Sequence, residues 1–415
     1  MDILETAFKQ SLSENLKPSY ILGLVIEKKF EKLGITLNKQ QLEQIENQIQ
    51  RNLEKNFKIN IELNEIQQKA FDLSKNTSKI ISLNENDKDL TEILEKITND
   101  VKELFPDVID EIADILLIDL HKDVHKMIAY IKNDQNYYKK SINKIWKTSF
   151  DLLEMLRIIS YEAGEKFNSK FRNTAALNND YVFDVLTRLH ARGCQVFSEI
   201  LVLLRSGFPD GAHARWRTLH ELSIIAMFIK QCGQSTAEKF ILYYHIESFF
   251  AAKKQLEFAE RLGIENISDE EFQEMKEIYD DLLFRFGNKY KDEYGWAYEE
   301  LGNGKLTFAE IEKKVEMDHY RPLYKMASSN VHSGPSGIIF KLGLYPGQDL
   351  LLCGPSNTGF ADPAFGAAIS LSQITITLLT LQPNFDRLVI CSILNKITFE
   401  VGNSFFDIQD KLENR

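Results

Sequence analysis

Apolar residues along this chain recur mainly every three or four positions, which is the spacing of an amphipathic α-helix. The longest such series begins after Pro106 and contains Val108, Ile109, Ile112, Ile115, Leu116, Leu120, Val124, Met127 and Ile131. A shorter series near the N-terminus contains Leu42, Ile45, Ile49 and Leu53. No stretch alternates apolar and polar residues between turns, as a strand would. The pattern predicts an all-α fold, a multi-helix assembly with a helical-bundle core.

Local signals predict where individual helices begin and end. Further helical spacing predicts helices over residues 137–167, 181–205 and 236–262. Capping-box pairs predict helix starts at Ser268 with Glu271 and at Thr307 with Glu310. Two aspartates next to prolines predict N-caps, namely Asp210 after Pro209 and Asp362 before Pro363. Glycine and proline cluster from residue 334 to 366 and predict a long loop there.

Length predicts more than one lobe, because 415 residues exceed an ordinary single domain. Between Pro18 and Pro106 there is no proline, and the first hundred residues are rich in Asn, Lys, Glu and Ile. We therefore expect an N-terminal helical region over residues 1–105 and a C-terminal all-helical domain over residues 106–415. No internal repeat of fixed period is apparent.

Composition favours a soluble globular protein, with 44% hydrophobic and 27% charged residues. The net charge of -11 argues against broad nonspecific coating of nucleic acid, although a local basic cleft stays compatible with it. The four cysteines are too widely spaced for a metal knuckle or a disulfide scaffold, and the first residues lack a secretory h-region, so we expect a cytoplasmic protein. The uncharged stretch 363–385 carries many Ser, Thr and Gln residues, which favours a buried helix over a membrane span. No phosphate-binding loop or dinucleotide fingerprint is present, so no cofactor is expected.

Arginine, histidine and carboxylate side chains are most concentrated between Leu203 and Glu221, in the sequence LLRSGFPDGAHARWRTLHE. At about 100° per residue, His213, Arg217 and His220 fall within one narrow wedge of the predicted helix. Glu221 and Trp216 border this wedge. Arg215 lies roughly 140° from His220 by the same geometry, so the two side chains of one helix do not converge directly.

Two resemblances follow from these residues. Arg215 and His220 form an Arg-x4-His arrangement that resembles the motif of the HEPN superfamily of helical ribonucleases, although Trp216 stands where that family commonly has a polar residue. The wider pattern of LLRSG, ARWRTLHEL and YKMASSNVHSGP resembles the uncharacterised bacterial domain of unknown function family 5677, over roughly residues 181–337. The second resemblance implies an all-helical fold and brings no activity with it.

The HEPN resemblance implies metal-independent cleavage of RNA, in a protein of bacterial defence or toxin type. His220 would act as general acid or base, and Arg215 or Arg217 would stabilise charge on the phosphoryl oxygens. The motif usually works where two such helices meet, so a homodimer is a candidate assembly. The expected catalytic residues are Arg215, Arg217, His220, Glu221 and His332. The expected substrate contacts are Arg205, His213 and Asn330.

A second hypothesis needs no active site. Arg215 is then a buried arginine paired to a carboxylate, and Arg217 forms an i,i+4 pair with Glu221. His332, with Asn330 and Ser333 at the end of a predicted helix, then serves only as a cap favoured by the helix dipole. The chain is in that case a non-enzymatic helical interaction protein, whose Arg/His-rich helix is a structural network or a partner-binding surface.

Two other polar groups are weaker candidates. His121 and His125 have the i,i+4 spacing of a zinc pair, but they lack the usual glutamate after the first histidine, so we expect a surface pair and no metal site. Four lysines, Lys139, Lys140, Lys144 and Lys147, alternate with Tyr137, Tyr138 and Trp146. This strip could contact RNA or could be a solvated helix face.

Overall fold

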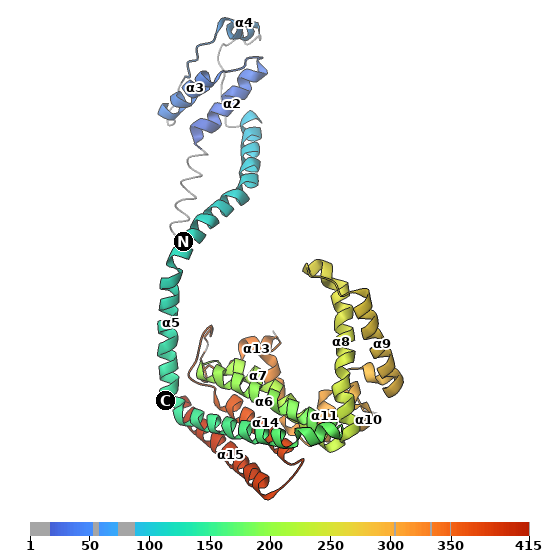
Figure 1. The fold of residues 1–415 in the computed structure, drawn as a ribbon. Helices are drawn as coiled ribbons and strands as arrows, with labels where there is room; N and C mark the ends of the chain where they lie inside the picture. Colours follow the sequence, from blue (N-terminus) through green and yellow to red (C-terminus); the bar gives the residue numbers. More distant parts are fainter. Residues whose placement is uncertain are drawn as a thin grey trace. The chain divides into compact units, whose positions relative to one another are not determined.

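The computed structural model describes residues 17–52, 58–73, 88–302, 304–332, 334–348 and 350–414. All regular structure in these ranges is helical, with no strand, which confirms the predicted all-α fold (Figure 1). The α-helices are α2 (Pro18–Lys32), α3 (Lys39–Asn52), α4 (Glu65–Leu73), α5 (Lys88–Leu177), α6 (Tyr181–Arg205), α7 (Pro209–Cys232), α8 (Gln234–Leu262), α9 (Asp269–Phe286), α10 (Tyr298–Leu301), α11 (Phe308–Lys314), α12 (Arg321–Ser329), α13 (Pro335–Ile339), α14 (Ala361–Leu379) and α15 (Phe385–Glu413). Short 3-10 helices cover Asn288–Lys291, Gly295–Ala297 and Asp318–Tyr320.

Contacts divide the chain into two compact units, residues 1–127 and 128–415. The sequence placed this boundary at residue 106. In the first unit, α2 and α3 enclose a small core that includes Phe30, Ile45 and Ile49. The polar stretch at residues 76–89 carries turn-forming residues that predict a loop. It lies almost entirely outside the described residues; the last two of its positions, 88 and 89, begin α5.

A short internal repeat organises the first unit. Its two copies are I-T-L-N-K-Q-Q, beginning at Ile35, and I-E-L-N-E-I-Q, beginning at Ile61. In each copy the asparagine and the glutamine three residues later exchange backbone-to-side-chain hydrogen bonds of 2.9 to 3.0 Å. The two glutamines, Gln41 and Gln67, are buried and bond each other at 3.0 and 3.1 Å. The motif recurs once, 26 residues further along the chain, and two copies set no fixed period.

Helix α5 is continuous from Lys88 to Leu177. It runs through Pro106, so the prediction that a new helix starts there was wrong, and the helix predicted over residues 137–167 is part of the same element. A proline inside a helix removes one backbone hydrogen bond and clashes with the preceding turn, at a cost of about 3 kcal/mol.

The second unit is built around α14, which packs against α6, α7 and α15. This helix is almost wholly buried, as predicted for the uncharged stretch, and small residues let its neighbours approach closely. At Gly366 an added Cβ would lie 2.8 Å from Nε1 of Trp216 on α7. Among the described residues no helix is long and apolar enough to cross a membrane.

A second core lies where α8, α9, α11 and α12 meet α6 and α7. The predicted capping box at the start of α9 is confirmed, because Ser268 and Glu271 satisfy each other's backbone N–H groups. The cap at the start of α11 is also present, with the hydroxyl of Thr307 accepting from the N–H of Glu310. Helix α6 has the predicted bounds.

The two predicted aspartate caps were wrong. Helix α7 has Phe208 at its N-cap and Pro209 at its first position, and α14 has Phe360 at its N-cap. Asp210 instead accepts hydrogen bonds from the backbone N–H groups of Leu342, at 3.0 Å, and Gly343, at 3.5 Å. Its carboxylate therefore holds the loop after α13 against the start of α7.

Asp210→Ala is expected to lower the free energy of unfolding by about 1–3 kcal/mol, because hydrogen bonds to a charged acceptor are lost. Thermal and urea unfolding measure the loss. Asp210→Asn keeps one acceptor oxygen and should lose less. Equal melting curves for the wild type and Asp210→Ala would contradict the loop-anchoring role.

Candidate functional site

Helix α7 carries the Arg/His-rich segment and presents its polar wedge to α11 and α12. The two histidines of the wedge are buried, with exposures of 1% for His213 and 2% for His220, and so is Trp216 at its border. The side chain of Arg217 is 26% exposed. Trp216 stacks on His213, at 5.3 Å between ring centroids, and packs at a tilt against His220, at 5.4 Å. The predicted wedge therefore exists, but an aromatic side chain separates its two histidines.

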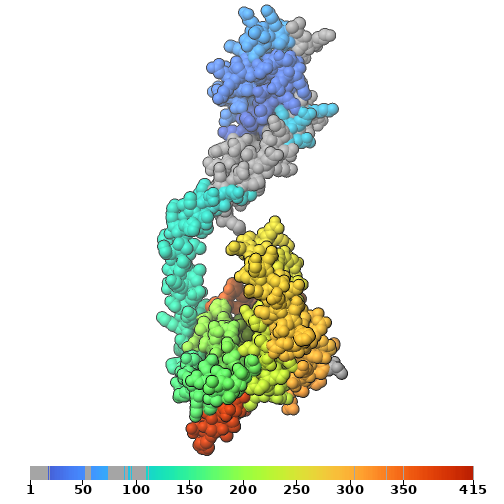
Figure 2. All heavy atoms as spheres, turned by 45° about the vertical axis from the view of Figure 1, so that its right-hand side comes forward, coloured from blue at the N-terminus to red at the C-terminus, as the bar shows by residue number. Residues whose placement is uncertain are grey.

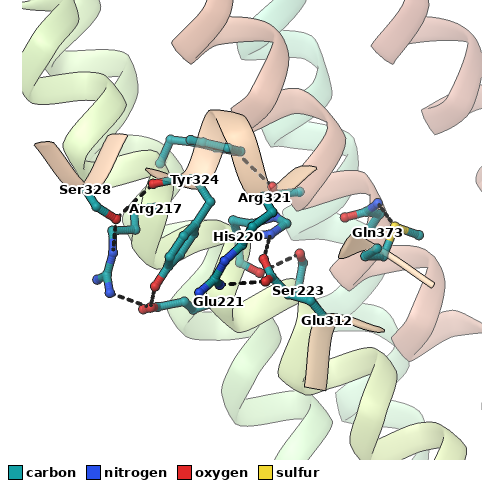
Figure 3. A network of polar contacts seen from close by, with 12 residues as sticks. Arg217, His220, Glu221, Ser223, Glu312, Arg321, Tyr324, Ser328 and Gln373 are labelled. Atoms are coloured by element: carbon teal, nitrogen blue, oxygen red, sulfur yellow. Dashed lines mark hydrogen bonds and ion pairs between the residues drawn. The ribbon is translucent and has the colours of Figure 1, made fainter. Parts of the chain in front are cut away.

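His220 is held by a buried carboxylate. Its Nε2 lies 3.1 Å from Oε1 of Glu312 on α11, and the other oxygen of Glu312 accepts from Nη1 of Arg321 at 2.7 Å (Figure 3). Glu312 has no exposed surface. An ionised carboxylate only accepts, so the His220 Nε2–H donates to it. This row of His220, Glu312 and Arg321 joins α7, α11 and α12.

Arg217 has three partners on one side of the same network. Its Nη2 lies 3.0 Å from Oε1 of Glu221, its Nε donates to the Ser328 hydroxyl at 3.1 Å, and its guanidinium lies 4.8 Å from the centre of the Tyr324 ring. The Tyr324 hydroxyl donates to Glu221 (Figure 3). Burial and then this hydrogen bond raise the pKa of Tyr324 above its usual value, so it stays a neutral donor.

Arg215 belongs to a different environment. It pairs with Glu199 on α6 and donates to the Thr218 hydroxyl at 3.3 Å. Its partners and those of His220 lie on different helices, as the predicted separation of about 140° requires. Within one chain, the two residues of the Arg-x4-His pair therefore do not meet at one site.

The remaining predicted site residues are dispersed. His213 is buried and burial lowers its pKa to about 4, so it is neutral near pH 7. Arg205 pairs with Glu154 of α5 at 3.3 Å, and Asn330 is the C-cap of α12. His332 is exposed just beyond that helix. Ser333 lies outside the described residues. The structure thus joins Arg217, His220 and Glu221 in one network and leaves Arg205 and His332 outside it.

Sequence reasoning missed four members of this network, Glu312, Arg321, Tyr324 and Ser328. Glu312 lies 92 positions after His220, so no local spacing could pair them. One signal was available in α11. Glu312 falls on the buried side of this helix, whereas Lys313 and Lys314 lie on its outer side. Arg321 and Tyr324 occupy the first turn of α12.

The two weaker candidates can also be placed. His121 and His125 are both exposed, and within the described part of the chain no three potential ligands gather as a metal site would need. In the lysine strip, the four lysines are exposed. Trp146, in contrast, is fully buried and donates to the backbone carbonyl of Asn357 at 2.9 Å. Trp146 is thus a core residue and does not belong to that strip.

One comparison with known protein families matches the part of the chain that contains the network around His220. Residues 183–345 match the model of a family of unknown function (DUF5677). The matched region runs from α6 past α13 and contains every residue of the network around His220, in agreement with the resemblance over residues 181–337. No curated protein and no solved structure matches the chain. The HEPN resemblance stays a prediction.

Proposed function

We propose that this chain is a non-enzymatic helical interaction protein, in which the Arg/His-rich helix α7 is a structural network. The observation that carries the proposal is that His220, 2% exposed, is bound to a carboxylate with no exposure. A general acid or base must come within hydrogen-bonding distance of its substrate. Nε2 of His220 contacts Glu312 at 3.1 Å, so this nitrogen is occupied by the protein itself.

The charge around α7 supports the same proposal. Arg215 is paired with Glu199, Arg217 with Glu221 and Arg321 with Glu312. A phosphodiester approaching Arg217 would meet the carboxylate of Glu221, which repels it and already occupies the guanidinium. Arginines that stabilise a phosphoryl group need free donors directed at that group. These arginines instead tie α6, α7, α11 and α12 together.

The competing hypothesis, RNA cleavage with His220 as acid or base, makes the opposite prediction for one variant. We expect wild type to leave a mixed pool of small RNAs intact in chelator. We expect His220→Ala to lower the free energy of unfolding by about 1–3 kcal/mol, because a buried hydrogen bond is broken. Gel analysis of the RNA and thermal melts measure the two effects.

His332→Ala is the matched control, since His332 is exposed and should melt like wild type. Cleavage by wild type that disappears in His220→Ala, while the mutant keeps its melting temperature, would overturn the proposal. General acid–base help is worth about 10²–10⁴ in rate, so such a loss would be plain.

A further inference from the structure

A cavity of about 530 Å³ opens on the surface of the second unit. It lies between the loop after α13, the start of α14 and the end of α15, and its described lining residues all fall between Ile339 and Glu413. Figure 2 shows part of α15, coloured red, uncovered at the edge of this unit. Sites for small molecules commonly have volumes of about 300–1,000 Å³, so this cavity is large enough for one.

The walls of the cavity are held in place by hydrogen bonds within the protein. Asp210 accepts from the N–H group of Leu342 in the loop wall, at 3.0 Å. At the α15 wall, Gln409 accepts from the N–H group of Gly359 at 2.9 Å and donates to the Thr358 hydroxyl at 2.8 Å. A ligand would therefore enter a site that is already formed, which reduces the entropic cost of binding.

Carboxylates dominate the charge of this cavity. Three of them line it, Asp362 at the start of α14 and Asp410 and Glu413 at the end of α15. Lys341 is the one cation among the described lining residues, and its ammonium group donates to the backbone carbonyl of Gly337. The cavity is thus net negative and would attract a positively charged ligand.

Asp362 is the least accessible of the three carboxylates. Burial, and then the charge of Glu413, raise its pKa above the usual value. Both causes oppose the ionised form of Asp362, and a cation bound in the cavity would offset both.

Aromatic and aliphatic side chains form much of the remaining lining. Phe340 and Phe406 keep 56% and 38% of their surface exposed, and Leu344 and Tyr345 are half-buried. Apolar walls take methylene groups out of water, and aromatic rings attract ammonium groups. The cavity therefore suits a cation with an aliphatic body better than a bare inorganic ion.

The three carboxylates are not placed to share one metal ion. Within the described part of the chain, no three side chains of His, Cys, Asp or Glu gather closely enough to hold one. Negative charges that are spread over a cavity suit a ligand whose positive charges are spread in the same way. A chain of methylene groups that links two or more ammonium groups has this form.

We propose that this cavity binds a linear aliphatic polyammonium ion, that is, a diamine or polyamine. Its ammonium groups pair with the carboxylates of Asp362, Asp410 and Glu413, and its methylene groups lie against Phe340 and Phe406. A single lysine side chain carries one ammonium group and would match only one of the three carboxylates. The inference goes beyond the proposed function, because none of these residues belongs to the network around His220.

Calorimetric titration of the full chain with spermidine tests the proposal. Wild type is expected to bind one spermidine per chain, with a dissociation constant below about 1 mM at about 0.15 M salt. n-Butylamine and N-acetyl-lysine amide, which carry one ammonium group each, should bind at least about tenfold more weakly, because they leave carboxylates unpaired. Mg²⁺ supplies charge without methylene groups and should also bind at least about tenfold more weakly.

Two variants test the cavity from two helices. Asp362→Asn in α14 and Asp410→Asn in α15 each remove one carboxylate with little change in volume, and each should weaken spermidine binding by about tenfold. Asp407→Asn is the matched control, because it changes the net charge equally at an exposed position of α15 that is not among the lining residues. Thermal melts check that each variant is folded. Spermidine should raise the melting temperature of wild type and Asp407→Asn more than that of the other two.

Failure of this inference is distinguishable from failure of the proposed function. Wild type that takes up no spermidine, or binds it no better than Mg²⁺ or n-butylamine, would overturn the polyammonium site. Equal binding by wild type, Asp362→Asn and Asp410→Asn would overturn it too, as would an equal weakening in Asp407→Asn. The ribonuclease assay contains no spermidine and separately decides the proposed function of α7.

Discussion

Glu312→Ala is expected to lower the free energy of unfolding by about 3–5 kcal/mol, the loss that follows when one partner of a buried ion pair is removed. Glu312 has no exposed surface and accepts from both His220 and Arg321. Without it, the Nε2–H of His220 loses its partner in a buried site, and Arg321, whose side chain is 33% exposed, loses a carboxylate partner. Urea unfolding monitored by circular dichroism measures the change.

Two variants separate the loss of the carboxylate from a general weakening of α11. Glu310→Ala changes a glutamate of the same helix that is half-buried, and it should cost well under 1 kcal/mol. Glu312→Gln keeps an acceptor oxygen and the side-chain volume, so its loss should fall between those of the other two. A Glu312→Ala protein as stable as Glu310→Ala would show that the row of His220, Glu312 and Arg321 contributes little.

Helices were predictable because their apolar spacing is local. The bounds of α6, the capping box of α9 and the burial of α14 all follow from short segments read without any partner. The wedge of His213, Arg217 and His220 was predictable for the same reason, since residues three and four apart on a helix share a side. In these parts of the chain, neighbouring residues alone determine the local structure.

The aspartate caps failed because a carboxylate can bond any nearby N–H group. Asp210 satisfies the N–H groups of Leu342 and Gly343, more than 130 positions away, and so it is not available as a cap. Burial and the charge of Glu413 raise the pKa of Asp362, which also lies inside its helix and not at the cap. Residue type alone does not distinguish a local partner from a distant one.

The network around His220 was only half predictable for a related reason. Its α7 members share one helix, but Glu312, Arg321 and Tyr324 reach them only after α11 and α12 pack on α7. The ion pair between Arg217 and Glu221 was one of the two hypotheses for these residues, and their i,i+4 spacing is compatible with it. Spacing could not decide whether those charges face a substrate or each other, because that depends on what covers them.

A last expected result concerns pH and two buried histidines. His190 on α6 lies 3.2 Å from the Thr375 hydroxyl of α14, and burial, only partly opposed by a backbone hydrogen bond at Ser160, lowers its pKa to about 4. Burial also lowers the pKa of His213 to about 4. Both are neutral in the folded protein at pH 5, whereas in the unfolded chain their pKa is about 6.5.

The unfolded state therefore binds more protons than the folded state between pH 6.5 and pH 4, and stability is lost as the pH falls through this window. At pH 5 each histidine should cost about 2 kcal/mol relative to pH 8, so the two together should cost about 4 kcal/mol. Urea unfolding at a series of pH values and one protein concentration measures this dependence.

Carboxylates titrate in the same range, so the decisive quantity is the difference between variants. His213→Leu removes one of the two buried groups and should flatten the dependence by about 2 kcal/mol between pH 8 and pH 5. His332→Leu changes an exposed histidine and should leave the dependence as it is in wild type. If His213→Leu and wild type lose the same stability over this window, His213 is not held neutral by burial, and the wedge of α7 is more open to water than its 1% exposure implies.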